Sequence, residues 1–296
     1  MARLVLVIGE ALVDEFHDGH VAGGAPFNVA RSLAALGAPV RFASRIGSGD
    51  AAGRLVLDSA LSFGLGVEGI QRDARRATGR VSVHEEGGGH RFEIHADAAW
   101  DHLEPVDTAG AGLVYFGSLA QRAPASRASI RAAVKRGGAP VLLDLNLRPG
   151  TDTPALAAES LMLADWLKIN EDELDRLIAW FEPDLPSLMA RFALQRVIVT
   201  RGEAGYAVYG EHGALLTSGE GVAQAAFVDS VGAGDSFTAV LLAGLALGCD
   251  LGATLRLANR YAAMICGVRG PLPDDPAVLA PWREALHALP LEEARA

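Results

Sequence analysis

The glycine-rich segment Asp229-Ser-Val-Gly-Ala-Gly-Asp-Ser-Phe-Thr238 holds the residue types of this chain best suited to chemistry. A strand is predicted before it and a helix after it, so that Gly232, Ala233 and Gly234 fall at a helix N-terminus. Unpaired backbone N–H groups and the positive end of the helix dipole meet there, which favours an anion such as phosphate. Glycines also permit the tight turn and the close approach of a ligand.

Asp235 stands in the first turn of the same predicted helix. One interpretation is a capping residue that only stabilises the helix end. The other is a catalytic base, because phosphoryl transfer needs anion donors beside a group that receives the proton of the attacking hydroxyl. The stretch from Gly232 to Asp235 would supply both, close to where charge develops in the transition state.

The segment resembles the C-terminal signature of the PfkB carbohydrate kinases, D-T-x-G-A-G-D-x-F, with Ser230 in place of threonine. An earlier stretch, Gly23-Gly24-Ala-Pro-Phe-Asn28-Val-Ala-Arg-Ser-Leu-Ala-Ala-Leu-Gly37, resembles the partner signature G-G-x-x-x-N-x-A-x-x-L-x-x-L-G. Further matches, in the expected order, are Gly47-Ser-Gly-Asp-Ala-Ala-Gly53, Asp144-Leu-Asn-Leu-Arg-Pro149, Asn170-Glu-Asp-Glu173 and Thr200-Arg-Gly-Glu-Ala-Gly205. The resemblance spans almost the whole chain and implies an ATP-dependent sugar kinase.

The resemblance also implies roles at the acceptor site. Asp235 would deprotonate a sugar hydroxyl, and the amides of Gly232, Ala233 and Gly234 would form the anion hole. Asp14, Gly24 and Asn28 would hydrogen-bond the sugar, although turn and capping roles explain Gly24 and Asn28 equally well. Asp14 is the more telling, since it follows the carboxyl end of the first predicted strand, where open α/β sheets bind ligands.

A second set of residues is implied for the nucleotide and its cations. Glu173 would hold Mg²⁺ through water, which suits a hydrated ion bound by few carboxylates, or it is simply an acid at a helix N-terminus. Asp229 would bind a monovalent cation such as K⁺, or it is an ordinary loop residue. The residues expected to contact ATP are Asn170, Thr200, Gly202, Gly205 and Asn259.

Arginines add two expectations. Arg148 directly follows a predicted strand, and its fork-shaped guanidinium suits bidentate contact with a phosphate, although a surface salt bridge is an equal alternative. Arg80 and Arg91 lie on a predicted hairpin and would bind an acidic sugar if they point into the cleft. If they face outward, a neutral sugar fits better.

The elements that position these residues follow the pattern of βαβ units, because short apolar runs alternate with longer Ala/Leu-rich stretches. A parallel sheet with helices on both faces follows, which agrees with the three-layer α/β/α core of ribokinase-like proteins. The clearest strands are 4–8, 113–116, 141–145, 166–169 and 197–200, and the helices are 26–36, 51–63, 126–135, 154–163, 171–180 and 185–192.

Two regions depart from this alternation of strands and helices. Residues 78–85 and 90–95 alternate like strands across Gly87-Gly88-Gly89, which predicts a hairpin that joins 13–21 in a small β lid. We therefore expect a core of residues 1–12, 26–76 and 102–296 and a lid of 13–25 and 77–101. Because a two-stranded lid is marginally stable alone, we expect a homodimer formed through it. Later, 206–209, 214–217 and 224–228 are predicted as antiparallel strands, followed by helices 235–247 and 276–287.

Composition narrows the class of protein. The net charge of −10 over 296 residues disfavours electrostatic binding to nucleic acid or to an anionic membrane surface. The apolar N-terminal run is followed by acidic residues and resembles a buried strand more than a signal peptide, so a soluble cytoplasmic protein is expected. Cys249 and Cys266 are too few for a disulfide framework and are expected to be buried packing residues.

Other functions fit the sequence less well. The two lysines, Lys135 and Lys168, do not follow glycine, which excludes a Walker P-loop, and the spacing in 47–53 disfavours a dinucleotide fingerprint. The scattered histidines do not predict a zinc site. A sugar or nucleotide sensor on the same fold is the non-enzyme alternative, which the retention of Asp235 disfavours. Asn146-Leu-Arg-Pro149 resembles the fructokinase and 2-keto-3-deoxygluconate kinase branches of the family more than ribokinase or adenosine kinase. The expected reaction is phosphorylation of D-fructose to fructose 6-phosphate; the alternatives are 2-keto-3-deoxygluconate kinase or another PfkB sugar or nucleoside kinase.

Overall fold

A central sheet of nine strands dominates the computed structural model, which describes residues 2–17, 19–86, 89–148, 150–223 and 227–292 and, within these, side chains other than those of 83–92. Its strands are β1 (Leu4–Ile8), β4 (Val40–Gly47), β5 (Ile70–Asp73), β8 (Ala111–Gly117), β9 (Val141–Asp144), β10 (Trp166–Asn170), β11 (Arg196–Thr200), β12 (Tyr206–Tyr209) and β13 (Leu215–Gly219). Their order is β13-β12-β11-β10-β9-β8-β1-β4-β5, and all pairs are parallel except those of β12 with β11 and β13.

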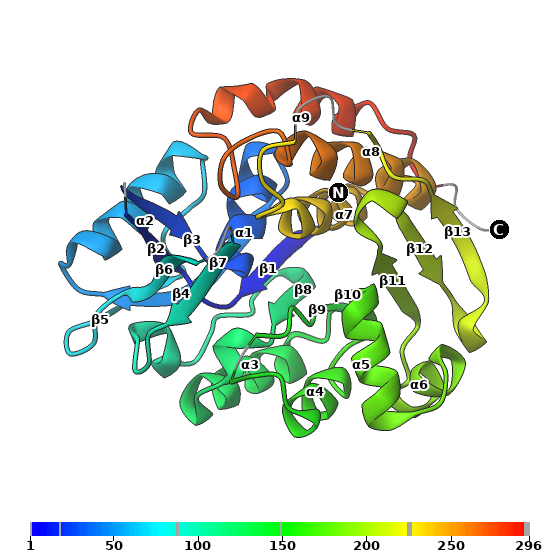
Figure 1. The fold of residues 1–296 in the computed structure, drawn as a ribbon, viewed down its shortest axis with the longest axis horizontal. Helices are drawn as coiled ribbons and strands as arrows, with labels where there is room; N and C mark the ends of the chain where they lie inside the picture. The colour runs from blue at the N-terminus through cyan, green and yellow to red at the C-terminus, as the bar shows by residue number, and fades with distance from the viewer. Residues whose placement is uncertain (1, 18, 87–88, 149, 224–226, 293–296) are drawn as a thin grey trace.

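Helices cover both faces of this sheet (Figure 1). On one face lie α1 (Ala25–Ala35), α7 (Ala233–Leu247), α8 (Leu251–Ile265) and α9 (Ala280–His287); on the other lie α3 (Pro124–Gly137), α4 (Pro154–Leu161), α5 (Glu171–Phe181) and α6 (Leu185–Phe192). The remaining helix, α2 (Ala51–Ser62), lies near β4 and β5. Within the described ranges, no helix has the length and apolar character needed to cross a bilayer.

The strand β1 shows why its sequence is apolar throughout. Val5 and Val7 pack into the core beneath α1, α7 and α8, whereas Leu6 and Ile8 pack into the core on the α3 and α4 side. All four side chains are fully buried. Because successive residues of a strand point to opposite faces, a strand covered on both sides must be apolar at every position.

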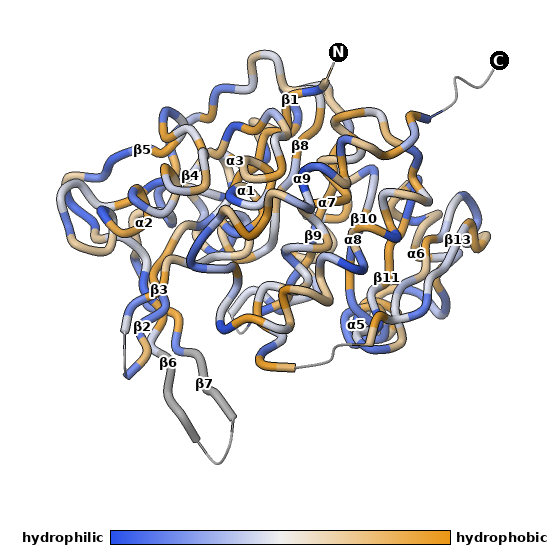
Figure 2. The backbone as a smooth tube through the Cα atoms, turned by 90° about the horizontal axis from the view of Figure 1, so that it is seen from above, coloured by the Kyte–Doolittle hydropathy of each residue, from blue (hydrophilic) through white to orange (hydrophobic). Residues whose placement is uncertain are grey.

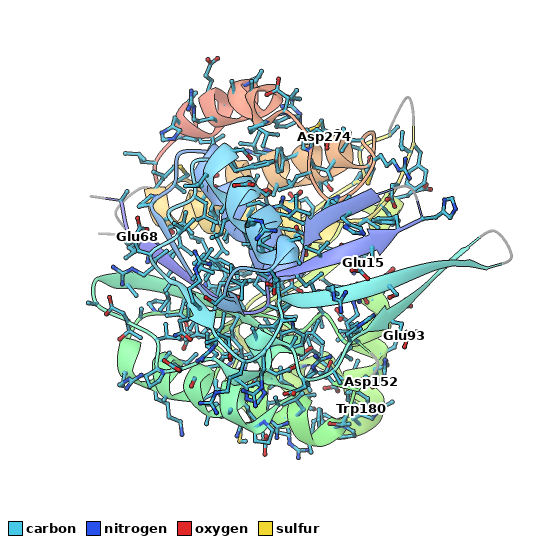
Figure 3. The ribbon with its side chains drawn as sticks, turned by 90° about the vertical axis from the view of Figure 1, so that its left-hand side faces the viewer. Glu15, Glu68, Glu93, Asp152, Trp180 and Asp274 are labelled. Atoms are coloured by element: carbon cyan, nitrogen blue, oxygen red, sulfur yellow. The ribbon has the colours of Figure 1, made fainter. Side chains whose placement is uncertain are left out.

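A separate sheet of four strands stands beside the core. It consists of β2 (Leu12–Phe16), β3 (Gly19–Gly23), β6 (Gly79–Glu86) and β7 (Gly89–Ile94), in the order β3-β2-β6-β7. Seen from above, β2 and β3 lie beside α2, at the opposite end of the molecule from α6 and β13 (Figure 2). Figure 3 shows this sheet, marked by Glu15 and Glu93, projecting from the layered body. The hairpin and the segment after the first strand thus combine in one sheet, as expected.

Three local predictions need correction. The strands β4 and β5 are absent from the predicted strands because charged residues interrupt their apolar pattern. Arg45 on β4 is half-buried, and its Nε lies 3.1 Å from Oδ2 of the buried Asp73 on β5. Residues 227–228 do not form a strand, because the Val228 amide donates to the Cys266 carbonyl oxygen at 2.8 Å; residues 224–226 of that prediction lie outside the described residues. The predicted helix 235–247 begins earlier, at Ala233.

Candidate active site

The helix α7 begins at the glycine-rich turn, as the sequence predicts. Its N-cap is Gly232, in the left-handed region at φ 79°, and no side chain caps the helix. A Cβ atom at Gly232 would lie 2.5 Å from the Pro271 carbonyl oxygen, so both backbone and space require glycine. Among the described residues, no protein acceptor takes the amides of Gly232 and Gly234, whereas the Ala233 amide donates to Ser230 at 3.2 Å. Two of the three expected anion-hole amides are therefore free for a ligand.

Asp235 lies in the first turn of α7 but does not cap the helix. Its Oδ2 accepts a hydrogen bond from Asn28 Nδ2 at 2.8 Å, across 207 residues of sequence. Burial raises the pKa of this carboxyl to about 6, the charge of Asp144 adds to the shift, and the Asn28 bond, Lys168 and Arg148 oppose it. The capping interpretation is therefore wrong, and the pKa of this carboxyl lies closer to neutral pH than that of an ordinary Asp.

The other residues expected near the acceptor gather around this pair. Asp14 lies on β2, and burial raises the pKa of its carboxyl to about 6, with Arg31 opposing and the charge of Asp235 adding to the shift. Gly24 is the N-cap of α1 at φ 106°, and a Cβ atom there would lie 2.8 Å from the Glu10 carbonyl oxygen. Asp14, Gly24 and Asn28 thus meet Asp235 at one place.

Glu10 belongs to the same group, although the sequence did not single it out. Its side chain is only 2% exposed, and Oε2 has no hydrogen-bond partner among the described residues. Burial raises the pKa of this carboxyl to about 7, with a further contribution from Asp235 and opposition from Arg148. The available signal was its position two residues after the end of β1, the same reasoning that selected Asp14.

Arg148 lies in the turn that follows β9. Asn146 begins that turn with φ 42°, a left-handed conformation that Asn tolerates better than most residues. The Arg148 guanidinium donates to the Leu147 carbonyl oxygen at 3.2 Å, and its charge lowers the pKa of both Asp235 and Glu10. No ion pair of Arg148 occurs within the described part of the chain, so the surface salt bridge is not its role in this structure. The side chain of Arg91, on β7, lies outside the described residues.

A cavity of about 580 Å³ opens beside the start of α7. Four of the residues expected to bind ATP line it: Thr200, Gly202, Gly205 and Asn259. Asn170, the fifth, is not among its lining residues. Ala233 and Gly234 also face the cavity, so the turn that carries Asp235 forms one of its walls.

The apolar part of this cavity was not predicted. It comes from Val222 and Phe227, in the segment after β13, and from Ala262, Ala263 and Cys266 near the end of α8. Cys249 is buried as expected, whereas the half-buried Cys266 faces the cavity and is not a packing residue. An apolar wall with a few polar groups is typical of sites for small molecules and cofactors.

Glu173 and Asn170 form a capping box at the start of α5. The Asn170 Oδ1 accepts the Glu173 amide at 2.8 Å, and Glu173 Oε2 accepts the Asn170 amide at 3.0 Å. Glu173 Oε1 also accepts the Leu147 amide at 2.7 Å. Because backbone N–H groups occupy both oxygens, the carboxylate fits contact with a cation through water better than direct coordination.

Asp229 holds its own loop together. Its Oδ1 accepts the Val231 amide at 3.1 Å, while its backbone N–H donates to the Cys266 carbonyl oxygen at 3.2 Å. The ordinary loop role is therefore present in the structure. In the described part of the chain, no three His, Cys, Asp or Glu side chains cluster as metal ligands, so a cation would take much of its coordination from carbonyls, phosphate or water.

A buried cation lies beneath the start of α7. Lys168 pairs with Asp144, with 3.1 Å between Nζ and Oδ2, and Thr238 donates to the same oxygen at 3.0 Å. The Lys168 ammonium also lies 3.1 Å from where a Cβ atom of Gly234 would be, close to the residue that carries one of the free amides. The sequence offered no motif for this lysine, yet it adds positive charge at the predicted anion hole.

An α/β fold with two free amides at a helix start, a cavity of about 580 Å³ beside them and a buried carboxylate has the arrangement expected of a phosphotransferase. The sequence matches the pfkB family carbohydrate kinase over residues 5–277. The chain therefore belongs to this family of ATP-dependent carbohydrate kinases, and the expectation of an enzyme rather than a sensor is confirmed.

Individual relatives support the same conclusion. A fructokinase of Klebsiella pneumoniae is 32% identical over 82% of this chain and 84% of its own length, and a ribokinase of Arabidopsis thaliana is 30% identical over 86% and 70%. A fructokinase with bound ATP from Xylella fastidiosa superposes with TM-score 0.80, 25% identity and coverage of 96% and 100%. A Vibrio cholerae fructokinase bound to fructose, ADP and potassium has TM-score 0.79, 24% identity and coverage of 98% and 99%. The expected fold class is thus confirmed.

Proposed function

We propose that this kinase phosphorylates D-fructose to fructose 6-phosphate, with Asp235 as the base. One observation carries the assignment of the base: the start of α7 lies between the cavity, which Ala233 and Gly234 line, and the acidic group around Asp235. A nucleotide in the cavity would direct its phosphates at the free amides. A hydroxyl held beside Asp235 would then face the γ-phosphorus.

Each group has a separate task in the proposed transfer. Thr200, Gly202, Gly205 and Asn259 hold ATP in the cavity. Asp235 accepts the proton of the sugar hydroxyl as its oxygen bonds to the γ-phosphorus and the bond to the leaving ADP oxygen breaks. The amides at the start of α7 stabilise the negative charge on the transferred group, and the cations of Lys168 and Arg148 contribute from beneath and beside it.

Cations complete the proposed site. Glu173 and Asn170 would hold Mg²⁺ through water near the phosphates, where it would supply charge neutralisation. Asp229 would contribute to a K⁺ site that steadies the loop before α7, since only its Oδ1 is engaged by the Val231 amide. The potassium in the Vibrio cholerae relative supports this second proposal.

The choice of a neutral sugar has support from the small sheet. Arg80 pairs with Glu15, with 3.3 Å between Nη1 and Oε1. Glu15 neighbours Asp14 on β2, and successive residues of a strand point to opposite faces. Arg80 is therefore directed to the face opposite Asp14 and is not placed to bind a carboxylate beside Asp235. This favours fructose over 2-keto-3-deoxygluconate, as do the fructokinase relatives.

The substrate proposal is tested with an ADP-release assay over fructose, ribose, 2-keto-3-deoxygluconate and a nucleoside. Fructose is expected to give the highest kcat/KM. A higher value for ribose or the nucleoside would redirect the proposal within the family. A preference for the acidic sugar 2-keto-3-deoxygluconate would show that the Arg80–Glu15 ion pair is no evidence for a neutral substrate.

The rate should fall as pH is lowered through about 6. Asp235 must be unprotonated to accept a proton, and its pKa is raised to about 6, so kcat/KM is lost below that pH and retained above it. Asp14, with a pKa also raised to about 6, titrates in the same range. We call the fall of kcat/KM on the acid side of the pH profile the acid limb. The variant Asp14→Asn should weaken sugar binding but leave the acid limb in place. A limb near pH 4, the ordinary range of a carboxyl, would contradict a buried base.

Filling the cavity should separate the nucleotide site from the acceptor site. In the variant Ala263→Phe, a ring occupies the apolar wall, and KM for ATP is expected to rise at least about 10-fold while KM for the sugar stays within about twofold. The control Arg256→Phe adds the same ring to an exposed part of α8 away from the cavity. Equal effects of both variants would show that the cavity is not the ATP site.

We also propose that the small sheet closes over the acceptor as a lid and pairs with its counterpart in a homodimer. Asp14 on β2 interacts electrostatically with Asp235 and Arg31, so this sheet contributes a residue to the surroundings of the proposed base. Within the described residues, β3 and β7 have no partner on their outer edges, and Val21 on β3 is 38% exposed. Gel filtration at micromolar concentration should give about twice the 30.9 kDa chain mass, and a monomer would refute the dimer.

A further inference from the structure

Arg31 is a buried cation to which no motif assigns a task. It lies on α1, at one of the variable positions of the N-terminal signature, and only 4% of it is exposed. Removing a guanidinium from water costs several kcal/mol unless hydrogen bonds and opposite charges replace the lost hydration. Its partners therefore indicate what the burial serves.

Three acceptors from three elements hold the guanidinium. Nη2 donates to Asn28 Oδ1 at 2.6 Å and to the Ala22 carbonyl oxygen at 2.9 Å, and Nη1 donates to Ser59 Oγ at 2.7 Å. The ring of Phe27 packs against it, with 4.5 Å between the ring centroid and Cζ. This fork geometry suits arginine and cannot be reproduced by the single ammonium of lysine.

The contact with Asn28 determines which way its amide faces. A side-chain amide carries an acceptor oxygen and a donor nitrogen, and either could face Asp235. Because Arg31 offers only donors, the oxygen must face Arg31 and the nitrogen must face the carboxylate, as in the structure. The reverse orientation would set donor against donor and acceptor against acceptor.

We propose that Arg31 is a positioning residue for phosphoryl transfer: it orients the Asn28 amide, and that amide holds the Asp235 carboxylate toward the acceptor hydroxyl. The proposal rests on the role of Asp235 as base under the proposed function. Arg31 itself touches neither substrate nor the transferred group. Its effect passes through one hydrogen bond, from Asn28 to Asp235.

The charge of Arg31 adds a second effect on the same carboxylate. Asp14 and Asp235 both interact with it, so that loss of the cation should raise the pKa of both acids. Other charged and titratable groups surround Asp235 and must stay constant in a test. They are Glu10 after β1, Asp14 on β2, Tyr115 on β8, Asp144 on β9, Arg148 in the following turn and Lys168 on β10.

Two substitutions separate orientation from charge. The variant Arg31→Lys keeps the charge and loses the fork, so kcat should fall about 10- to 100-fold with little movement of the acid limb and an unchanged KM for ATP. The variant Arg31→Met should lose at least as much kcat and move the acid limb to higher pH. Wild-type kcat in folded Arg31→Lys, or an unmoved limb in folded Arg31→Met, would overturn the proposal.

A purely structural role is tested with Ser59→Ala. This variant removes the third acceptor of Arg31, on α2, without touching the contact to Asn28. Thermal unfolding should show a modest loss of stability, while kcat and the acid limb stay as in wild type. A kcat loss as large as that of Arg31→Lys would mean that any loosening of α1 against α2 has the same effect, which overturns the proposal.

Should both Arg31 variants fail to fold, Asn28→Asp tests the step on which the proposal depends, the bond from Asn28 to Asp235, with Arg31 intact. A carboxylate would then face Asp235 in place of the N–H donor, so the acid limb should move to higher pH. An unmoved limb would overturn the proposal, whatever the change in sugar affinity.

The background of Asp235→Asn distinguishes this inference from the proposed function. With the base removed, Arg31→Lys should lower the residual rate no further, because groups that act as one unit are not additive. A full additional loss would refute action through Asp235 and leave the proposed function standing. An Asp235→Asn enzyme with wild-type activity would refute the proposed function itself.

Discussion

Replacing Asp235 by asparagine is expected to lower kcat roughly 10²- to 10⁴-fold, with smaller changes in KM for ATP and sugar. The amide keeps the size of the side chain but cannot accept the proton of the attacking hydroxyl, and general base catalysis typically contributes that factor. The amides of Gly232 and Gly234 remain free, so residual activity is expected from charge stabilisation and positioning alone. Steady-state kinetics measures both parameters.

The matched control is Asp175→Asn, which makes the same chemical change on the exposed side of α5. Its kinetic constants should equal those of wild type. The variant Asp235→Glu, in which the carboxylate is displaced by one methylene, should retain more activity than Asp235→Asn. A kcat for Asp235→Asn within about twofold of wild type would remove Asp235 from the chemistry.

Replacing Lys168 by methionine is expected to lower the free energy of unfolding by about 3–5 kcal/mol. Lys168 and Asp144 form a buried pair, 7% and 2% exposed, and removal of one partner leaves the other charge uncompensated. Thr238 still donates to Asp144, but one hydroxyl bond replaces little of the lost attraction. Urea unfolding followed by circular dichroism gives the quantity directly.

The chain provides its own control for this variant. Lys135, its other lysine, is exposed on α3, and Lys135→Met should change the free energy of unfolding by less than about 0.5 kcal/mol. The double variant with Asp144→Asn should recover part of the loss, since no buried charge then remains unpaired. A loss below about 1 kcal/mol in the single variant would show that the pair contributes little to stability.

The sheet was predictable where its strands are covered on both faces. Runs such as Leu4–Ile8 are apolar at every position, and the structure shows Val5 and Leu6 packing on opposite sides. The strand β4 was missed because Arg45 interrupts its apolar pattern, and tertiary contacts with Asp73, Glu104 and the His102 carbonyl oxygen make that charge tolerable in a strand. Local pattern cannot show a partner that a distant segment supplies.

The same limit of local sequence pattern applies to the site, of which one part was predictable and another was not. The turn at Gly232 was predictable because glycine, a helix start and an acid occur in sequence. Lys168 was not, since its importance comes from Asp144 on β9, and Arg31 was not, since its importance depends on the contact of Asn28 with Asp235 on α7. Glu10 had only its position after β1 as a signal. The bond between Asn28 and Asp235 joins residues 207 positions apart, and only the fold brings them together.

The central claim is that the phosphoryl group passes across the start of α7 from ATP to a sugar hydroxyl beside Asp235. Phosphorus-31 NMR of the enzyme with ATP, Mg²⁺ and fructose tests it most directly, because the spectrum separates a sugar phosphate from the inorganic phosphate of ATP hydrolysis. The account predicts a growing fructose 6-phosphate signal in step with ADP, and almost none with Asp235→Asn. ADP accompanied only by inorganic phosphate, with every sugar offered, would contradict it.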